Sequence, residues 1–339
     1  MEEVALRLLN RTEKNIRDIL SLAIGHTPDH QALLVCDEQS FLSRLISQSY
    51  INILPDAIVL NFDRLAPEEI LRSIDRLAPG DLVVLVQSTS FRLNEFRIRL
   101  ELFNRRLKVI EHPHLARMLP EEFENYIDAL AYDPDYYRTV GPALKAKVDQ
   151  CQCIRLISGQ NVLSYNSSFE DTKLNIGDYR NMKNIGGQFP IGEVFSEPKE
   201  ISQVNGIVQI FAFGNKDFSV CAPEKPFTAT IENGVLIGAE ESPVDFKSIL
   251  TEIRSKEEKV WLRELGFGLN RALTRTRRVN DISAYERMCG IHLSLGGKHS
   301  LYTKPGFPKS NRFHVDVFVN ADRVEIDGET VFKDEGYSI

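Results

Sequence analysis

Short apolar runs alternate with amphipathic segments through the first 150 residues, and this alternation constrains the fold more than any other feature of the sequence. Each run has four or five residues, which suits a strand that is buried on both faces. The segments between the runs place apolar side chains at helical spacing. Strands that alternate with helices predict a parallel sheet wrapped by helices. The predicted strands are 32–36, 57–60, 82–86 and 107–110, and the predicted helices are 3–23, 38–49, 67–77, 91–105, 118–131 and 135–149.

The character of the chain changes near residue 150. From there on, Gly and Asn turns separate short alternating runs, and polar residues interrupt apolar strands. The segment CIRLISGQNVLSY (151–165) is typical of two antiparallel strands around a Gly-Gln turn. We therefore predict an α/β protein of two domains, with a Rossmann-like, doubly wound parallel-sheet domain over 1–150 and a mixed α/β domain over 151–339.

Several classes of function are disfavoured by the same sequence. No glycine-rich phosphate loop follows the predicted strands, which argues against nucleotide chemistry in the first domain. The net charge of -7, from 41 basic and 48 acidic residues, gives no support for nucleic-acid binding. No run of eighteen apolar residues exists, and the N-terminus mixes both charges, so we expect neither a membrane span nor a signal peptide. The five scattered Cys fit reduced thiols, and we expect a cytoplasmic protein.

Two histidines near the C-terminus are set in unusually apolar strands. In the run 313–319, FHVDVFV, side chains alternate, so His314 and Asp316 project from one face and the apolar residues from the other. The run IHLSL places His292 and Ser294 on one face in the same way. A buried carboxylate needs a partner, and a divalent cation is one. Two His and one Asp suffice for a catalytic zinc with a further carboxylate or for a ferrous facial triad, although each His alone also fits a structural role.

Two glutamates stand in similarly uncommon settings. Glu193 follows a glycine in GGQFPIGEVF, where flanking glycines let backbone approach a ligand closely. Glu264 lies in WLRELGFGLN. Structural alternatives remain open for both residues: a charge at the mouth of a glycine turn for Glu193, and a solvated helix residue paired with Lys259 for Glu264.

Four motifs in order resemble a known family. The segments GGQFPIGEVFSEP, ELGFGLN, ERMCGIHLSLG and FHVDVFV are similar to successive motifs of the metallo-aminopeptidases of the aminopeptidase T and aminopeptidase S family, over about residues 150–320. The resemblance implies a two-domain homodimeric enzyme that hydrolyses N-terminal peptide bonds with two divalent metals, Zn, Co or Mn, in its C-terminal domain. It puts five residues at metal-ligand positions: Glu193, Glu264, His292, His314 and Asp316.

The stretch around His292 departs from the acidic, glycine-rich segment that is usual in this family. Glu286 is a candidate further ligand or general base, with a surface helix residue beside Arg287 as the alternative. A Tyr usually follows the family's His closely, whereas here the chain continues to His299 and Tyr302. Either of these two residues is a candidate for stabilising the oxyanion.

Two further functions remain open. The 2,5-dihydroxypyridine dioxygenases resemble these peptidases but use one Fe(II), and His292, His314 and Asp316 match that site type. A peptide-binding relative without catalysis is the third interpretation. The two glutamates exceed what one iron needs, so the hydrolase is the leading prediction. The expected partners are a peptide or small-molecule substrate and a second copy of the chain, and neither nucleic acid nor membrane.

Overall fold

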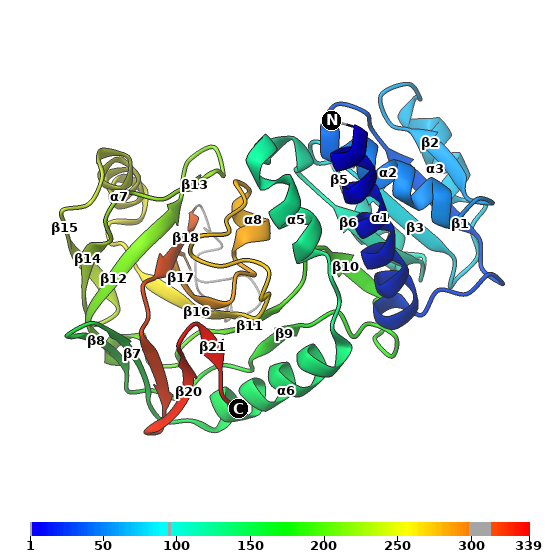
Figure 1. Ribbon diagram of the computed structural model, residues 1–339. Coiled ribbons are helices and arrows are strands. Elements are labelled where there is room, and N and C mark those ends of the chain that lie inside the picture. Colours follow the sequence, from blue (N-terminus) through cyan, green and yellow to red (C-terminus); the bar gives the residue numbers. More distant parts are fainter. Residues whose placement is uncertain (1, 94–95, 298–312) are drawn as a thin grey trace. The chain divides into compact units, whose positions relative to one another are not determined.

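The computed structural model describes residues 2–93, 96–297 and 313–339, which form two compact units (Figure 1). Unit one comprises Met1–Tyr136, Gly177–Ile191 and Val279–Asp281, and unit two comprises the remainder. The chain thus passes from unit one to unit two after Tyr136, before the predicted domain boundary near 150, and it returns to unit one twice. The boundary itself stays a prediction.

Unit one is a doubly wound α/β layer structure, as the alternation of strands and helices predicts. Its five-stranded sheet is parallel throughout and has the strand order β10-β6-β3-β1-β2. Its strands are β1 (Ala32–Cys36), β2 (Ile58–Asn61), β3 (Leu82–Val86), β6 (Lys108–His112) and β10 (Gly186–Gln188), and its helices are α1 (Glu2–Asp18), which continues as a π-helix over Ile19–Ile24, α2 (Phe41–Ile53), α3 (Pro67–Ile74), α4 (Ile98–Asn104) and α5 (Phe123–Ala129).

The apolar runs are continuous because both faces of the sheet are buried. On one face, Leu33 and Val35 of β1 pack in a core with Ile70 of α3 and Leu102 of α4. Leu34, between the two β1 residues, points to the opposite face and is equally buried. The helix predicted over 91–105 is wrong in its first half, because β4 (Arg92–Leu93) and β5 (Phe96–Arg97) pair there before α4 begins.

Unit two contains a large antiparallel sheet of fourteen strands. Its main path runs β21-β20-β19-β7-β8-β12-β18-β17-β16-β11-β9, with β13 and β14 paired to β12 and β15 paired to β14. The strands are β7 (Ile154–Ser158), β8 (Asn161–Tyr165), β9 (Lys173–Asn175), β11 (Glu193–Ser196), β12 (Val204–Gly214), β13 (Val220–Cys221), β14 (Phe227–Glu232), β15 (Val235–Glu240), β16 (Leu262–Gly268), β17 (Gly290–Gly296), β18 (His314–Val319), β19 (Arg323–Ile326), β20 (Glu329–Lys333) and β21 (Gly336–Tyr337).

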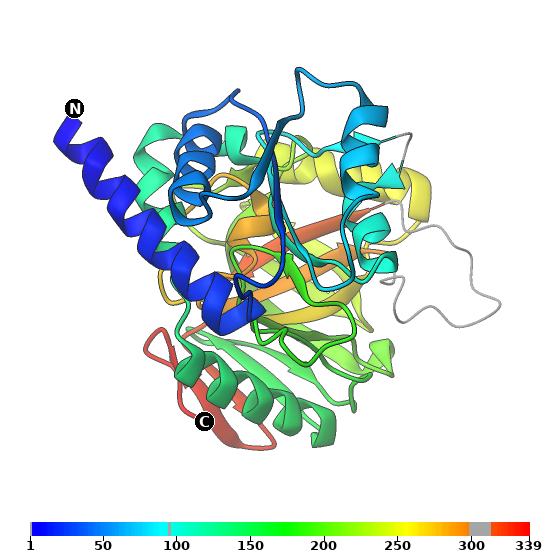
Figure 2. The same ribbon diagram turned by 90° about the vertical axis from the view of Figure 1, so that its right-hand side faces the viewer.

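Helices cover this sheet at separate places. The sheet side of α7 (Val244–Glu257) places Phe246 against the rings of Phe213 and Phe227, with centroids 5.0 and 4.8 Å away. Helix α6 (Pro134–Gln150) lies beside the C-terminal strands, where Lys147 pairs with Glu329 at 2.7 Å (Figure 2). The short α8 (Ile282–Tyr285) precedes β17. The parallel sheet of unit one and this mixed unit confirm the predicted fold class.

A helix that spans a bilayer needs about twenty predominantly apolar residues. In the described part of the chain, none is both long enough and apolar enough to cross a membrane.

Candidate metal centre

Four neighbouring strands of unit two bring acidic and imidazole side chains together. Strands β11, β16, β17 and β18 are consecutive and antiparallel in the sheet. In the register of the last three, Glu264, Ser294 and Asp316 stand side by side in one row. Residues two apart along a strand share a face, so His292 and His314 project on the same side as this row. The sheet register therefore gathers residues that are up to 123 positions apart in sequence, from Glu193 to Asp316.

The gathered side chains form two clusters with ligand atoms within 4.8 Å of one another. One cluster contains Glu193, Glu264 and His292, and the other contains Glu264, His314 and Asp316. Glu264 belongs to both. In the second, His314 Nε2 lies 3.1 Å from Asp316 Oδ1. All of these side chains except that of His314, which is 43% exposed, are buried.

The imidazole of His292 fits a metal ligand better than a structural histidine. The residue is only 1% exposed, and its Nε2 has no hydrogen-bond partner among the described residues. That atom lies 3.2 Å from Glu193 Oε1 and 3.9 Å from Glu264 Oε1, without hydrogen-bond geometry. A buried polar nitrogen without a hydrogen bond costs free energy. A divalent cation bound between this nitrogen and the two carboxylates would satisfy all three groups at once.

Ser294 connects the two clusters. Its hydroxyl donates to Asp316 Oδ1 at 2.6 Å and lies 3.3 Å from Glu264 Oε1. A hydrogen bond from a neighbour fixes which carboxylate oxygen is left for a ligand, as such partners do around metal sites. Ser294 therefore orients the carboxylates of Asp316 and Glu264.

A buried arginine lies behind Glu193. The Nη1 of Arg287 is 2.5 Å from Glu193 Oε2 and also 2.5 Å from Glu286 Oε1, and its side chain is 9% exposed. Glu193 thus uses Oε2 for the guanidinium and presents Oε1 to His292. The arginine compensates part of the negative charge of four neighbouring carboxylates, those of Glu193, Glu264, Glu286 and Asp316.

Burial and neighbouring charges shift the pKa values of the carboxylates and imidazoles at this centre. Burial raises the pKa of Glu264 to about 7 and that of Glu286 to about 8. Asp316 raises the pKa of His314 to about 10, and, against the effect of burial, Glu193 raises that of His292 to about 9. Burial opposes ionisation of Asp316 as well, yet the neighbouring His314 holds its pKa below the ordinary value. In the metal-free protein, bound protons supply the positive charge that bound cations would supply in their place.

The five predicted ligands all lie at this centre, and the structural alternative for Glu264, a solvated helix residue, is wrong. Glu264 lies in strand β16 and not in a helix, and Glu193 is buried in β11. Glu286 does lie beside Arg287, but its side chain is only 17% exposed. His299 and Tyr302 lie outside the described residues. Whether these residues bind metal or catalyse stays a prediction.

Sequence reasoning missed Arg287 as a site residue, and it did not recognise Gly266. Arg287 has no distinguishing local pattern, because its partner Glu193 lies 94 positions away. Gly266 did offer a signal: it follows Glu264 by two residues in ELGFG and so shares its face. A glycine at such a position indicates that another group approaches the strand closely. That group is the imidazole of His292, which is opposite Gly266 in the register.

A Gly266→Ala substitution is expected to destabilise the protein and weaken metal binding. The added Cβ would overlap the His292 ring, closer than nonbonded atoms can approach. Overpacking of a buried site costs about 1–3 kcal/mol, and a shift of the ring would move its Nε2 relative to the carboxylates of the cluster. Thermal unfolding and metal titration measure the two effects. Gly238→Ala on β15 is the matched control, since its Cβ would meet only Thr230 at 3.8 Å. Equal behaviour of the two variants would contradict the packing argument.

Comparison with known proteins relates this chain to others through its fold. No protein-family model matches the sequence, and no curated protein matches it. Among solved structures, 2,5-dihydroxypyridine dioxygenase from Pseudomonas putida KT2440 is similar with a TM-score of 0.62 at 12% identity, covering 98% of this chain and 97% of that one. Wild-type AmpT (aminopeptidase T) from Thermus thermophilus is similar with a TM-score of 0.60 at 12% identity, covering 97% and 99%. Both neighbours are enzymes, and the relation is one of fold.

Proposed function

From a fold shared with an aminopeptidase and a dioxygenase, we propose that this protein is a metal-dependent hydrolase that removes N-terminal residues from peptides, with two divalent cations per chain. The observation that carries the proposal is the presence of Glu264 in both three-residue clusters. A carboxylate has two oxygens, so one glutamate can serve two cations at once. Two ligand sets joined in this way are typical of two-metal hydrolytic sites.

The ligand set suits Zn²⁺, Co²⁺ or Mn²⁺. Each cluster combines one imidazole with two carboxylates, a donor set that these borderline cations accept. When bound, such a pair of cations lowers the pKa of a shared water and polarises the carbonyl of a substrate. Glu193 and His292 would hold one cation, and His314 and Asp316 the other.

Glu286 is the proposed general base. Its carboxylate shares the Arg287 guanidinium with the ligand Glu193, which keeps it next to the centre without making it a ligand. Burial raises its pKa to about 8 in the metal-free protein, and cations at the centre would lower that pKa toward neutrality, where the carboxylate can take and return a proton. His299 and Tyr302 remain proposed oxyanion-stabilising residues.

The iron dioxygenase alternative requires His292, His314 and Asp316 around a single ion. Among the described residues, the ligand clusters group His292 with the two glutamates and separate it from His314 and Asp316. Glu264 also occurs in both clusters, whereas a facial triad leaves it no role. These features support the hydrolase over the oxygenase.

Metal analysis of protein purified without added ions tests the proposal. We expect two equivalents of zinc, cobalt or manganese per chain, and release of the N-terminal residue from aminoacyl p-nitroanilides. Chelation should lower the rate at least about 100-fold, and it should also lower the unfolding temperature, because a cation at 100 times its Kd adds about 2.7 kcal/mol per site. One equivalent of iron with oxygen consumption would favour the dioxygenase. Full activity in chelator would reject both.

A further inference from the structure

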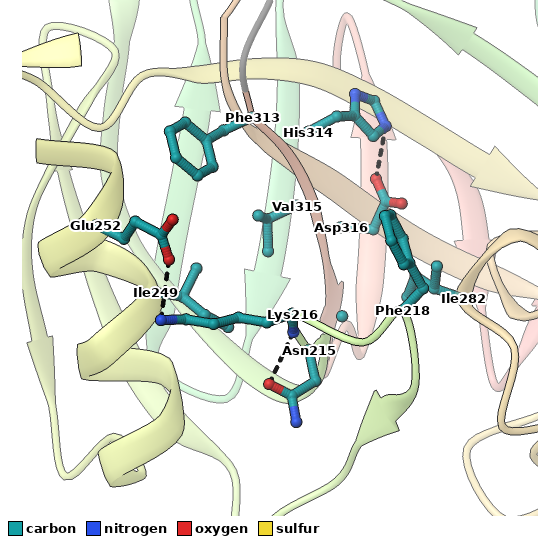
Figure 3. A pocket seen from close by; sticks show the side chains of 11 residues that line it. Asn215, Lys216, Phe218, Ile249, Glu252, Ile282, Phe313, His314, Val315 and Asp316 are labelled. Carbon is teal, nitrogen blue, oxygen red and sulfur yellow. Dashed lines mark hydrogen bonds and ion pairs between the residues drawn. The ribbon is translucent and has the colours of Figure 1, made fainter. Parts of the chain in front are cut away.

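A cavity of about 450 Å³ lies in unit two at the start of β18. The ligand candidates His314 and Asp316 line it at one end. Figure 3 shows Phe313 and Glu252 at the other side, with Val315 and Lys216 between them. The cavity has the size of an ordinary small-ligand pocket. A molecule held at His314 and Asp316 could therefore extend directly into it.

Five apolar side chains line the cavity. Ile249 comes from the sheet side of α7, Ile282 from α8, and Val315 from β18. Two aromatic rings, those of Phe218 and Phe313, complete the wall. Apolar walls with a few placed polar groups are typical of sites that bind a substrate by its hydrocarbon part.

The charged groups of the cavity neutralise each other. Lys216 Nζ lies 2.9 Å from Glu252 Oε2 and donates a hydrogen bond to Ser248 Oγ at 3.1 Å. His314 and Asp316 form a second ion pair at the other end, with 3.1 Å between Nε2 and Oδ1, so neither sign of charge is in excess among the lining side chains. An uncharged side chain is therefore a better occupant than a lysine or a glutamate.

Phe218 lines this cavity, and backbone hydrogen bonds fix its conformation. Its side chain is 57% exposed, although a phenylalanine is normally buried. Its φ is 66°, a left-handed conformation that is rare for a bulky residue and is often found at functional sites. The amide donates to Asn215 O at 3.0 Å and the carbonyl accepts from Ile282 N at 3.1 Å, which fixes this conformation. Figure 3 shows the ring next to Asp316 and Ile282.

We propose that this cavity binds the side chain of the substrate's N-terminal residue and selects large apolar ones, such as leucine, methionine and phenylalanine, with Phe218 as a specificity-determining residue. The inference rests on the proposed function, because it places the reacting bond at His314 and Asp316. Burial of the substrate side chain against Phe218, Ile249 and Val315 supplies the preference. A small side chain such as alanine would leave these contacts unmade.

Two Phe218 variants test the proposal by kinetics. For leucyl and phenylalanyl p-nitroanilide, Phe218→Ala is expected to lower kcat/KM about 10- to 100-fold, and for alanyl p-nitroanilide less than about 3-fold. Phe218→Gly should also lose the preference for large apolar residues, because the ring is what contacts the substrate. Glycine adopts the positive φ without strain, so this variant separates the loss of the ring from backbone strain. Ile237→Ala on β15, also an exposed apolar residue at 49%, is the control and should change nothing. An unchanged preference in both Phe218 variants would overturn the proposal.

Equilibrium binding separates this inference from the proposed function. Calorimetry on the protein as purified should show L-leucinol, which has no bond to cleave, binding at least about 10-fold more tightly than L-alaninol, and Phe218→Gly should remove the difference. That selectivity would support the cavity as a side-chain site even if no peptide bond were cleaved. Equal affinities, or no binding of either amino alcohol, would overturn it, even in an active peptidase.

Discussion

Glu264→Ala is expected to remove both cations from the protein and to abolish hydrolysis. Glu264 is 4% exposed and is the only described residue common to the two clusters, so its loss leaves each with a single carboxylate and one imidazole. Two-metal hydrolysis depends on every ligand, and a rate loss of at least about 1,000-fold is expected, roughly 4 kcal/mol of transition-state stabilisation. Metal analysis and steady-state rates measure both effects.

Two single-histidine variants sharpen this prediction. His292→Ala should remove about one of the two cations, and His314→Ala the other, whereas Glu264→Ala removes both. Glu232→Ala, an exposed glutamate at the end of β14, is the matched control and should keep full metal content. If Glu264→Ala retained two cations per chain, the shared-ligand arrangement would be wrong. If it lost only one, Glu264 would be a ligand of a single site.

Arg287→Met is expected to destabilise the metal-free protein by about 3–5 kcal/mol, because it leaves the buried carboxylate of Glu193, and the partly buried one of Glu286, without their guanidinium. Methionine retains most of the apolar stem, so the loss is mainly one of charge and hydrogen bonding. Urea unfolding in chelator measures the free energy of unfolding. Adding the divalent cation should recover part of the loss, since it supplies positive charge to Glu193.

A more exposed arginine provides the control for this experiment. Arg323 is 45% exposed and pairs with Glu325 at 3.0 Å, and Arg155 pairs with the same carboxylate. Arg323→Met should therefore cost less than about 1 kcal/mol. If Arg287→Met were equally mild in chelator, the buried guanidinium would not be holding Glu193 in place.

Local sequence patterns were enough to predict much of the fold. The run at 82–86 is apolar at every position, and it forms β3 in the middle of a parallel sheet. The failure at 91–105 has a local cause too: its apolar spacing resembled a helix, but β4 and β5 pair with each other over its first residues. Short strands of two residues have too few positions for their period to be read.

Side-chain alternation also identified most of the candidate site. It placed His314 with Asp316 and His292 with Ser294, because successive side chains of a strand point to opposite faces and residues two apart share one. It could not show that Glu264, Ser294 and Asp316 form one row, since register depends on which strands pair and at what offset.

What the sequence determined by itself is therefore the class of the fold and the identity of the acidic and imidazole side chains. Only the tertiary structure decided that Glu264 joins both clusters, that Arg287 lies behind Glu193, and that β10 completes the sheet of unit one. The physical reason is that periodicity is a property of neighbours along the chain. Convergence at a centre is set by strand pairings between residues tens of positions apart, and these are fixed only when the whole sheet forms.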